Sequence, residues 1–215
     1  MPEKKAIQIT PPNLQTIYIA IKGTSPYVQL RFSQKAKEQM RGKMLASAAA
    51  QAGKKREPRQ FDDEFEESMY KMKDGSRGIP CPAFRNACID ACRMTALPMT
   101  RAKMSIFVLA QGMDSLEPIP LVKIEGTPKV IESVVRNANG AADIRTRACW
   151  DEWSCTVPVQ FDGDQFTEEE VVNLFNRAGQ QCGVGEGRPF SKNSAGQGLG
   201  TFLVTVVIRF ILLQL

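Results

Sequence analysis

The chain has 215 residues, of which 43% are hydrophobic, and it carries a formal net charge of +5. These values are ordinary for one globular domain with insertions, and the moderate positive charge permits an anionic partner. The sequence contains no histidine. This absence removes the commonest general base near neutral pH and every Ser–His or Cys–His nucleophile pair, so we do not expect an enzyme.

Neither end of the sequence predicts a membrane segment. Residues 1–10 (MPEKKAIQIT) lack the apolar region of a secretory signal. The apolar run 201–215 is interrupted by Arg209, and it is shorter than the roughly 20 residues that a spanning helix needs. We therefore expect a cytoplasmic protein that does not associate with membranes.

The six cysteines form no CxxC pair, so the sequence predicts no zinc site and no other metal or cofactor. Cys88 and Cys92 are four residues apart, which places both on one face of a helix. This spacing is typical of core packing, and we expect buried free thiols in a reducing compartment.

The first part of the chain predicts a strand followed by a basic insertion. Leu14–Gly23 alternates apolar and polar residues, with Ile17, Ile19 and Ile21 on one face. The elements expected after it are a short strand over 27–32, a helix over 33–50, a loop over 51–60 and a short helix within 61–73.

The middle of the chain predicts one helix and several strands. Pro82 suits the first turn of a helix over 82–94, whose apolar stripe contains Phe84, Cys88 and Ala91. The strands expected next are 103–111, a hairpin of 119–125 and 129–136 around Gly126, then 144–150 and 153–161. Pro158 favours an edge position or a bulge for the last of these strands.

The C-terminal part predicts a helix, a loop and a strand. Thr167 and Glu170 form a capping box for a helix over 167–179, and Gly179 is expected to end it. A strand over 201–210 closes the chain. The regular elements then read strand, helix, strand, strand, helix, strand.

This order predicts an α+β fold with a ferredoxin-like, or RRM-like, β-α-β-β-α-β core in a single domain, 1–215. The core would consist of 14–26, 79–116 and 151–210. A basic insertion, 27–78, follows the first strand, and an insertion of β-hairpins, 117–150, lies in the middle.

The loop before the last strand, GVGEGRPFSKNSAGQGLG (183–200), is the most unusual segment of the sequence. Glycines let backbone N–H groups approach an anion without an intervening Cβ, and Arg188 and Lys192 can pair with phosphate. The alternative is a surface loop whose glycines only permit tight turns. A P-loop is excluded because the GxxxxGK[ST] pattern is absent.

The glycine spacing, Gly183-x-Gly185-x-Gly187 and then Gly196-x-Gly198-x-Gly200 before a strand, resembles the glycine-rich loop of the RAMP superfamily, the repeat-associated RNA-binding proteins of CRISPR effector complexes. The segment GIPCPAFRNA (78–87) is similar to the "IPGSSLRGALR"-like entry of that family into its first helix. The phrase KGTSP (22–26) is similar to its first-strand exit, and also to "GTSPLL"-like motifs of phage and prophage proteins.

The resemblance implies RNA binding and assembly along a strand, and two departures argue against cleavage. No aspartate lies in 23–33, where the RNA-cleaving backbone subunits of the family carry one, and the histidine of its processing endonucleases is absent. Cys81 or Pro82 also replaces the glycine of the "IPGSS" pattern.

The stretch from Arg31 to Arg59 contains nine cations and only two acidic residues, Glu38 and Glu57. A solvated helix face is the alternative reading of this stretch. Arg145 and Arg147 share one strand face and could meet nucleic acid or pair with carboxylates such as Asp143. The candidate binding residues are therefore Arg31, Lys35, Arg41, Lys43, Lys54, Lys55, Arg56, Arg59, Arg145, Arg147, Gly183, Gly185, Gly187, Arg188, Lys192, Gly196, Gly198 and Gly200.

Together these features predict a non-catalytic protein of phage or prophage origin that binds single-stranded nucleic acid, RNA rather than DNA, and forms a homo-oligomer or a subunit of a ribonucleoprotein filament. One alternative is a phage assembly protein that uses the same fold for protein–protein contacts. A carboxylate-based, metal-dependent nuclease would need a convergent acidic cluster, which the sequence does not show.

Overall fold

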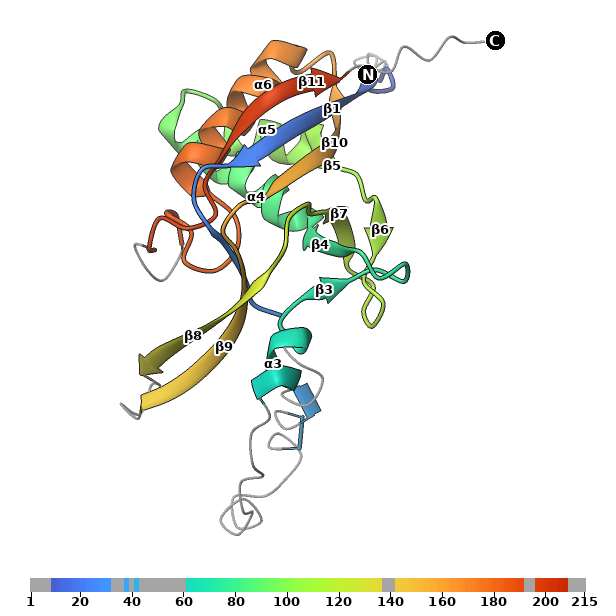
Figure 1. The fold of residues 1–215 in the computed structure, drawn as a ribbon. Coiled ribbons are helices and arrows are strands. Elements are labelled where there is room, and N and C mark those ends of the chain that lie inside the picture. The colour runs from blue at the N-terminus through green and yellow to red at the C-terminus, as the bar shows by residue number, and fades with distance from the viewer. Residues whose placement is uncertain are drawn as a thin grey trace, which may run out of the picture.

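The computed structural model describes residues 9–31, 37–38, 41–42, 61–136, 142–191 and 196–208. It is a mixed α+β structure that contains several antiparallel sheets (Figure 1). Among the described residues, no helix has the length and apolar character needed to cross a membrane.

The largest element is a four-stranded antiparallel sheet with the strand order β11-β1-β10-β5. Two helices, α4 and α6, lie behind this sheet in Figure 1, together with the shorter α5. The bounds of these elements are β1 Leu14–Gly23, α4 Cys81–Ala91, α5 Met99–Ser105, β5 Ile106–Val108, β10 Ser154–Asp162, α6 Glu168–Arg177 and β11 Phe202–Ile208.

The core lies between this sheet and its helices, and the alternation of buried and more exposed residues is clearest in β1. Ile17, Ile19 and Ile21 of β1 are buried, as the sequence periodicity predicts. Phe202 of β11 packs edge-on against Phe84 of α4 and Trp153, at ring centroid distances of 5.9 and 6.1 Å. The helices thus cover one face of the sheet and leave the other face open.

Two smaller sheets are built mostly from the expected insertions, 27–78 and 117–150, but β6 and part of β4 come from the segment 79–116 that was expected to belong to the core. The second sheet has the order β2-β9-β8, and the third has the order β3-β4-β7-β6. The bounds of these strands, and of the helix α3 that precedes β3, are β2 Tyr27–Gln29, α3 Phe61–Glu67, β3 Tyr70–Lys71, β4 Arg77–Pro80, β6 Gly112–Met113, β7 Pro120–Lys123, β8 Lys129–Arg136 and β9 Ala142–Trp150.

The expected hairpin of 119–125 with 129–136 is wrong. β7 pairs with β4 and β6, whereas β8 pairs with β9, so the two segments belong to different sheets. Gly126, at φ +115°, redirects the chain, and a Cβ there would lie 2.4 Å from the backbone oxygen of Glu152. Gly126 does change the direction of the chain, but the two segments that it joins belong to different sheets and do not pair as a hairpin.

Two expected boundaries also differ from the structure. Residues 103–105 belong to α5, which Pro98 precedes at the N-cap, so the strand begins only at Ile106. Gly179 does not end the helix begun by the Thr167–Glu170 capping box, because α6 continues as a π-helical turn, η2 (Ala178–Cys182). Gly179 is needed for a close approach instead, since a Cβ would lie 2.2 Å from the Phe202 oxygen.

β10 is a central strand, paired with β1 and β5, although Pro158 favours an edge. The β5 ladder ends at the pair Val159–Val108, directly beside Pro158, and the Pro158 oxygen accepts a 2.9 Å bond from Leu109 N–H. The proline therefore lies where that ladder stops. Most of the expected helix over 33–50, and the loop over 51–60, lie outside the described residues.

Replacing Phe202 by alanine tests the core that joins β11 to α4 and Trp153. We expect a loss of about 3–5 kcal/mol in the free energy of unfolding, since a fully buried aromatic ring leaves a cavity. Met104→Ala, at a side chain that is 72% exposed, should change stability by no more than about 0.5 kcal/mol. Urea unfolding measures both, and equal losses would contradict this packing.

Candidate nucleic-acid interface

The glycine-rich loop, 183–200, joins η2 to β11, and its glycines are required by its backbone. All six, Gly183, Gly185, Gly187, Gly196, Gly198 and Gly200, have φ between +66° and +84°. This left-handed region costs a residue with a Cβ roughly 1–2 kcal/mol. The loop therefore needs glycine for its conformation alone.

Close contacts add a second requirement at several of these positions. A Cβ on Gly200 would lie 1.8 Å from the Val184 oxygen, and one on Gly185 would lie 2.5 Å from both the Tyr27 ring and the Val28 oxygen. Gly198 differs, because a Cβ there would meet nothing within 4 Å among the described residues. Most of the loop is thus packed against β2 and against itself.

Many backbone N–H groups of the loop are already used within the protein. Glu186 N–H donates to Val28 O at 2.9 Å, Gly200 N–H to Pro26 O at 2.8 Å, and Gln197 N–H to Gly187 O at 2.7 Å. A cradle of free N–H groups around a phosphate is therefore not what this conformation offers over most of its length.

The two cations of the loop are Arg188 and Lys192. Arg188 is partly buried, its Nη1 donates to Gly185 O at 3.2 Å, and it lines a cavity of ≈ 130 Å³ with Asn86 and Asp90 of α4. Lys192 lies outside the described residues. The structure therefore describes one cation in the loop, and it lines a cavity that the Asp90 carboxylate also lines.

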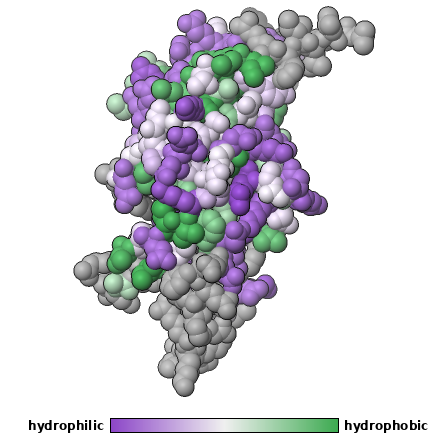
Figure 2. All heavy atoms as spheres, in the orientation of Figure 1, coloured by the Kyte–Doolittle hydropathy of each residue, from purple (hydrophilic) through white to green (hydrophobic). Residues whose placement is uncertain are grey.

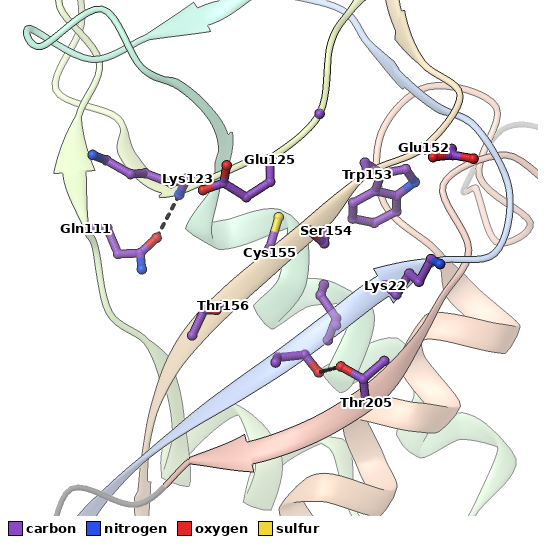
Figure 3. Close-up of a pocket in the computed structure, with 13 residues that line it drawn as sticks. Lys22, Gln111, Lys123, Glu125, Glu152, Trp153, Ser154, Cys155, Thr156 and Thr205 are labelled. Atoms are coloured by element: carbon purple, nitrogen blue, oxygen red, sulfur yellow. Dashed lines mark hydrogen bonds between the residues drawn. The ribbon is translucent and has the colours of Figure 1, made fainter.

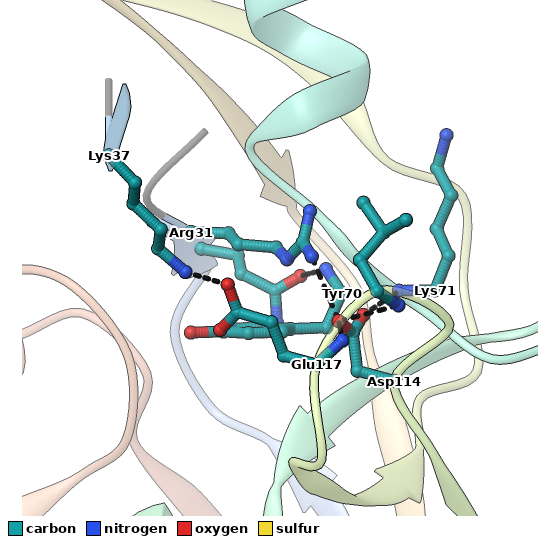
Figure 4. Close-up of polar contacts among 8 residues, drawn as sticks. Arg31, Lys37, Tyr70, Lys71, Asp114 and Glu117 are labelled. Carbon is teal, nitrogen blue, oxygen red and sulfur yellow. Dashed lines mark hydrogen bonds and ion pairs between the residues drawn. The ribbon is translucent and has the colours of Figure 1, made fainter. Parts of the chain in front are cut away.

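Arg31, a predicted phosphate ligand, is instead a structural residue (Figure 4). Its side chain is 4% exposed and forms a 2.8 Å ion pair with Asp114, whose side chain is 1% exposed. Asp114 also accepts bonds from the backbone N–H groups of Lys71 and Glu117, and the Arg31 guanidinium lies 5.6 Å from the Tyr70 ring centroid. A guanidinium in this position is not presented to a ligand, so this assignment is corrected.

The remaining predicted cations are distributed as follows. Arg147 of β9 pairs with Glu186 of the glycine-rich loop at 2.7 Å. It therefore pairs with a carboxylate, which was the expected alternative to nucleic-acid binding, although the partner is Glu186 and not Asp143. Arg145 on the same strand is half-buried, and Arg41 is exposed. Outside the described residues lie Lys35, Lys43, Lys54, Lys55, Arg56 and Arg59.

An open groove of ≈ 600 Å³ lies against the helix-free face of the four-stranded sheet (Figure 3). Its floor comes from β1, β10 and β11, and its opposite wall comes from the third sheet and the segment after β7. The polar residues that line it include Lys22, Gln111, Lys123, Glu125, Glu152, Ser154, Thr156 and Thr205. Sequence reasoning did not find this groove.

The groove lining carries two lysines, Lys22 and Lys123, and two glutamates, Glu125 and Glu152, so its formal charges cancel. Lys22 is exposed, and Lys123 forms a 3.0 Å pair with Asp74 in which both side chains are about half exposed. Hydrogen bonds from Ser76 and Lys123 hold the pKa of Asp74 well below its usual range. An anionic ligand would therefore compete with Asp74 for Lys123, whereas Lys22 is directly accessible.

Trp153 borders the groove but is only 3% exposed. Its Nε1 donates to Ser25 O at 2.9 Å, and Tyr27 lies between it and Trp150, with ring centroids 5.4 and 5.5 Å away. Both tryptophans are thus core residues, and neither ring is presented to stack on a base.

The cysteines offer no reactive thiolate among the described residues. All six are buried and unpaired, and burial raises the pKa of Cys81 and of Cys182 to about 11. A thiol with such a pKa stays protonated near neutral pH. The described residues also contain no group of three or more His, Cys, Asp or Glu side chains placed to hold a metal ion.

No protein-family model matches the chain, and no curated protein matches it.

Replacing Gly200 by alanine should destabilise the fold by more than about 2 kcal/mol, because a positive φ and a contact with the Val184 oxygen act together. Gly198→Ala shares the positive φ but has open space around it, so we expect a loss of about 1 kcal/mol. Thermal unfolding of both variants measures the difference. Equal effects would mean that the close approach of Gly200 is not present in solution.

Replacing Arg31 by methionine leaves the Asp114 carboxylate buried without its counter-ion. We expect a loss of about 3–5 kcal/mol in unfolding free energy. The matched control is Lys129→Met, which breaks the 2.6 Å pair with Asp151 where both side chains are more than half exposed. That loss should stay below about 1 kcal/mol, and a similarly small loss for Arg31→Met in chemical denaturation would refute the structural role of Arg31.

Proposed function

We propose that this chain binds single-stranded nucleic acid without cleaving it, RNA in preference to DNA, on a ferredoxin-like core. Support for the core comes from the order β1, α4, β5, β10, α6, β11 along the chain and the order β11-β1-β10-β5 within the sheet. That arrangement has two crossover helices on one face and an open sheet on the other.

The observation that carries the proposal is the open groove on the helix-free face of the sheet. An extended single strand of nucleic acid binds to a long, solvent-open surface with accessible cations and hydrogen-bonding groups, and not in an enclosed pocket. The groove supplies Lys22 together with the hydroxyl groups of Ser154, Thr156 and Thr205 and the amide of Gln111.

The cationic segment that leaves β2 provides the second support. Arg31 and Lys37 pair with Asp114 and Glu117. The same stretch of sequence contains seven further cations, which in this proposal contact phosphate: Lys35, Arg41, Lys43, Lys54, Lys55, Arg56 and Arg59. Such contacts supply most non-specific affinity for nucleic acid. In this proposal the glycine-rich loop has a structural role, and it contacts nucleic acid through Arg188.

The similarity of KGTSP (22–26) to motifs of phage and prophage proteins is the basis for proposing a phage or prophage protein that acts in the bacterial cytoplasm. The working form would be a homo-oligomer or a subunit of a ribonucleoprotein filament. The second candidate is a phage assembly protein, favoured by exposed apolar residues on β8, β9 and β11. The most exposed are Val130, Val134, Ile144 and Val206.

Fluorescence anisotropy with labelled single-stranded RNA and DNA at two salt concentrations tests the proposal. We expect affinity to fall steeply with salt, and RNA to bind more tightly. The triple variant Lys54/Lys55/Arg56→Ala should weaken binding at least about tenfold and flatten the salt dependence, since phosphate contacts are lost. Lys22→Ala should weaken binding with little change in stability.

Lys103→Ala is the matched control, because Lys103 is exposed on α5, behind the sheet in Figure 1. Its affinity should equal that of the unmodified chain. Absence of binding at low salt would refute the proposal and favour the assembly protein. Equal losses of affinity in the Lys22→Ala and Lys103→Ala variants would show that the groove is not part of the nucleic-acid interface.

A further inference from the structure

The described lining of the groove contains no exposed aromatic ring on which a base could stack. Trp153 is its one aromatic lining residue, and it is 3% exposed. Figure 2, drawn with the helices behind as in Figure 1, shows mainly hydrophilic and neutral residues across the middle of this side. Proteins that bind single strands commonly stack bases on aromatic side chains. Among the large hydrophobic residues that the structure describes as exposed, one is aromatic, Phe190, at 38% exposure.

Phe190 belongs to the glycine-rich loop and is held close to α4. Its N–H donates to Cys182 O at 3.2 Å. The guanidinium of Arg93, in the single turn η1 (Cys92–Met94) that follows α4, lies 5.9 Å from the centroid of the Phe190 ring. The loop therefore presents an exposed ring in a fixed place, next to a second planar group.

The cavity of ≈ 130 Å³ that Phe190 lines lies between α4 and the start of the glycine-rich loop. On the helix side Ala83 and Ala87 line it, and on the loop side Gly183 and Gly185 line it without adding a side chain. Drug-sized ligands occupy pockets of roughly 300–1,000 Å³. This cavity is therefore of a size for a single ring system and not for a larger ligand.

Asp90 and Arg188 line the cavity from its two walls without neutralising one another. Within the described residues, Asp90 pairs with Arg93 at 3.5 Å and not with Arg188, whose Nη1 donates to Gly185 O at 3.2 Å. Both charges act on Cys182, which lines the same cavity. Burial raises the pKa of Cys182, Asp90 raises it further, and Arg188 lowers it. One small cavity thus contains a charged acceptor and a charged donor.

We infer that this cavity binds one base of the single strand, and that the base carries both an exocyclic amino group and a carbonyl oxygen. The amino group donates to the Asp90 carboxylate, the carbonyl oxygen accepts from the Arg188 guanidinium, and the Phe190 ring stacks on the base. Cytosine and guanine carry both groups. Adenine lacks the carbonyl and uracil lacks the amino group, so each leaves one charged side chain without a partner. The inference rests on the proposed function and adds base selectivity to it.

NMR titration of the ¹⁵N-labelled full chain with mononucleotides tests the cavity without a strand. UMP is CMP with its amino group replaced by a carbonyl oxygen, and IMP is GMP without its amino group. We expect CMP to bind at least about tenfold more tightly than UMP, or GMP than IMP, since a hydrogen bond to a charged group is lost. The shifted N–H signals should include those of Gly183, Gly185 and Asn86. The pair that discriminates identifies the base, and no discrimination in either pair would overturn the inference.

The use of free nucleotides separates this inference from the proposed function. Single-stranded RNA that binds with equal affinity for every base, together with nucleotide pairs that do not discriminate, would refute the base site alone. Selective nucleotide binding at Gly183 and Gly185 by a chain that binds no strand would support the base site and refute the proposed function.

Two variants assign the selectivity to this cavity. Asp90→Asn keeps the shape of the side chain but replaces one acceptor oxygen by a donor, so the preference within the discriminating pair should fall to less than about twofold. Ala83→Leu should fill the cavity and weaken both members of the pair at least about tenfold. The matched control is Asp164→Asn, at an exposed carboxylate before α6, whereas the cavity lies beyond the end of that helix. A preference that survives Asp90→Asn, or that Asp164→Asn removes equally, would contradict the site.

Discussion

The three buried residues of β2 hold the separate parts of this structure together. Tyr27 lies between Trp150 and Trp153, and the Val28 oxygen accepts the N–H of Glu186 from the glycine-rich loop. The Gln29 side chain donates to Tyr27 Oη and Gly78 O and accepts from Tyr70 N–H. All three sheets and the loop therefore meet at one short strand, and each of these polar contacts is buried or partly buried, where an unpaired group is costly.

This junction explains the glycines better than a phosphate cradle does. The loop has to cross β2 at a distance that leaves no room for a Cβ at Gly185, and it must then return to begin β11. A sequence rich in glycine beside a strand suggests ligand binding when it is read alone, since both uses require the same residue. The structure favours the conformational use, because most of the described loop is in contact with protein and many of its N–H groups already have partners.

Local pattern predicted the elements that local interactions stabilise. The alternation in β1, the stripe of α4 and the capping box of α6 are confirmed, since each is a pattern that can be read within about ten consecutive residues, even though the partners of β1 are far away in the sequence. The pairing of Arg31 with Asp114, 83 residues away, depends on how two sheets meet, and no spacing in the sequence records it. The same is true of the groove, whose two walls come from segments far apart along the chain. The hairpin around Gly126 failed for a related reason, because a turn residue identifies a turn and not the partner of the strand that follows it.

The Arg31–Asp114 pair also bears on how the chain can carry a long cationic segment. The backbone N–H of Arg31 donates to Ser68 O at 3.0 Å, and Ser68 Oγ accepts from Ala148 N–H of β9. The chain therefore leaves β2 and returns after α3 at a single closed point that is tied to the second and third sheets. Once such a point is closed, lengthening the segment between its ends costs only about 0.6 kcal/mol per doubling. A closed base of this kind limits the stability cost of a longer insertion, and it requires that one cation, Arg31, pair with Asp114 instead of a ligand.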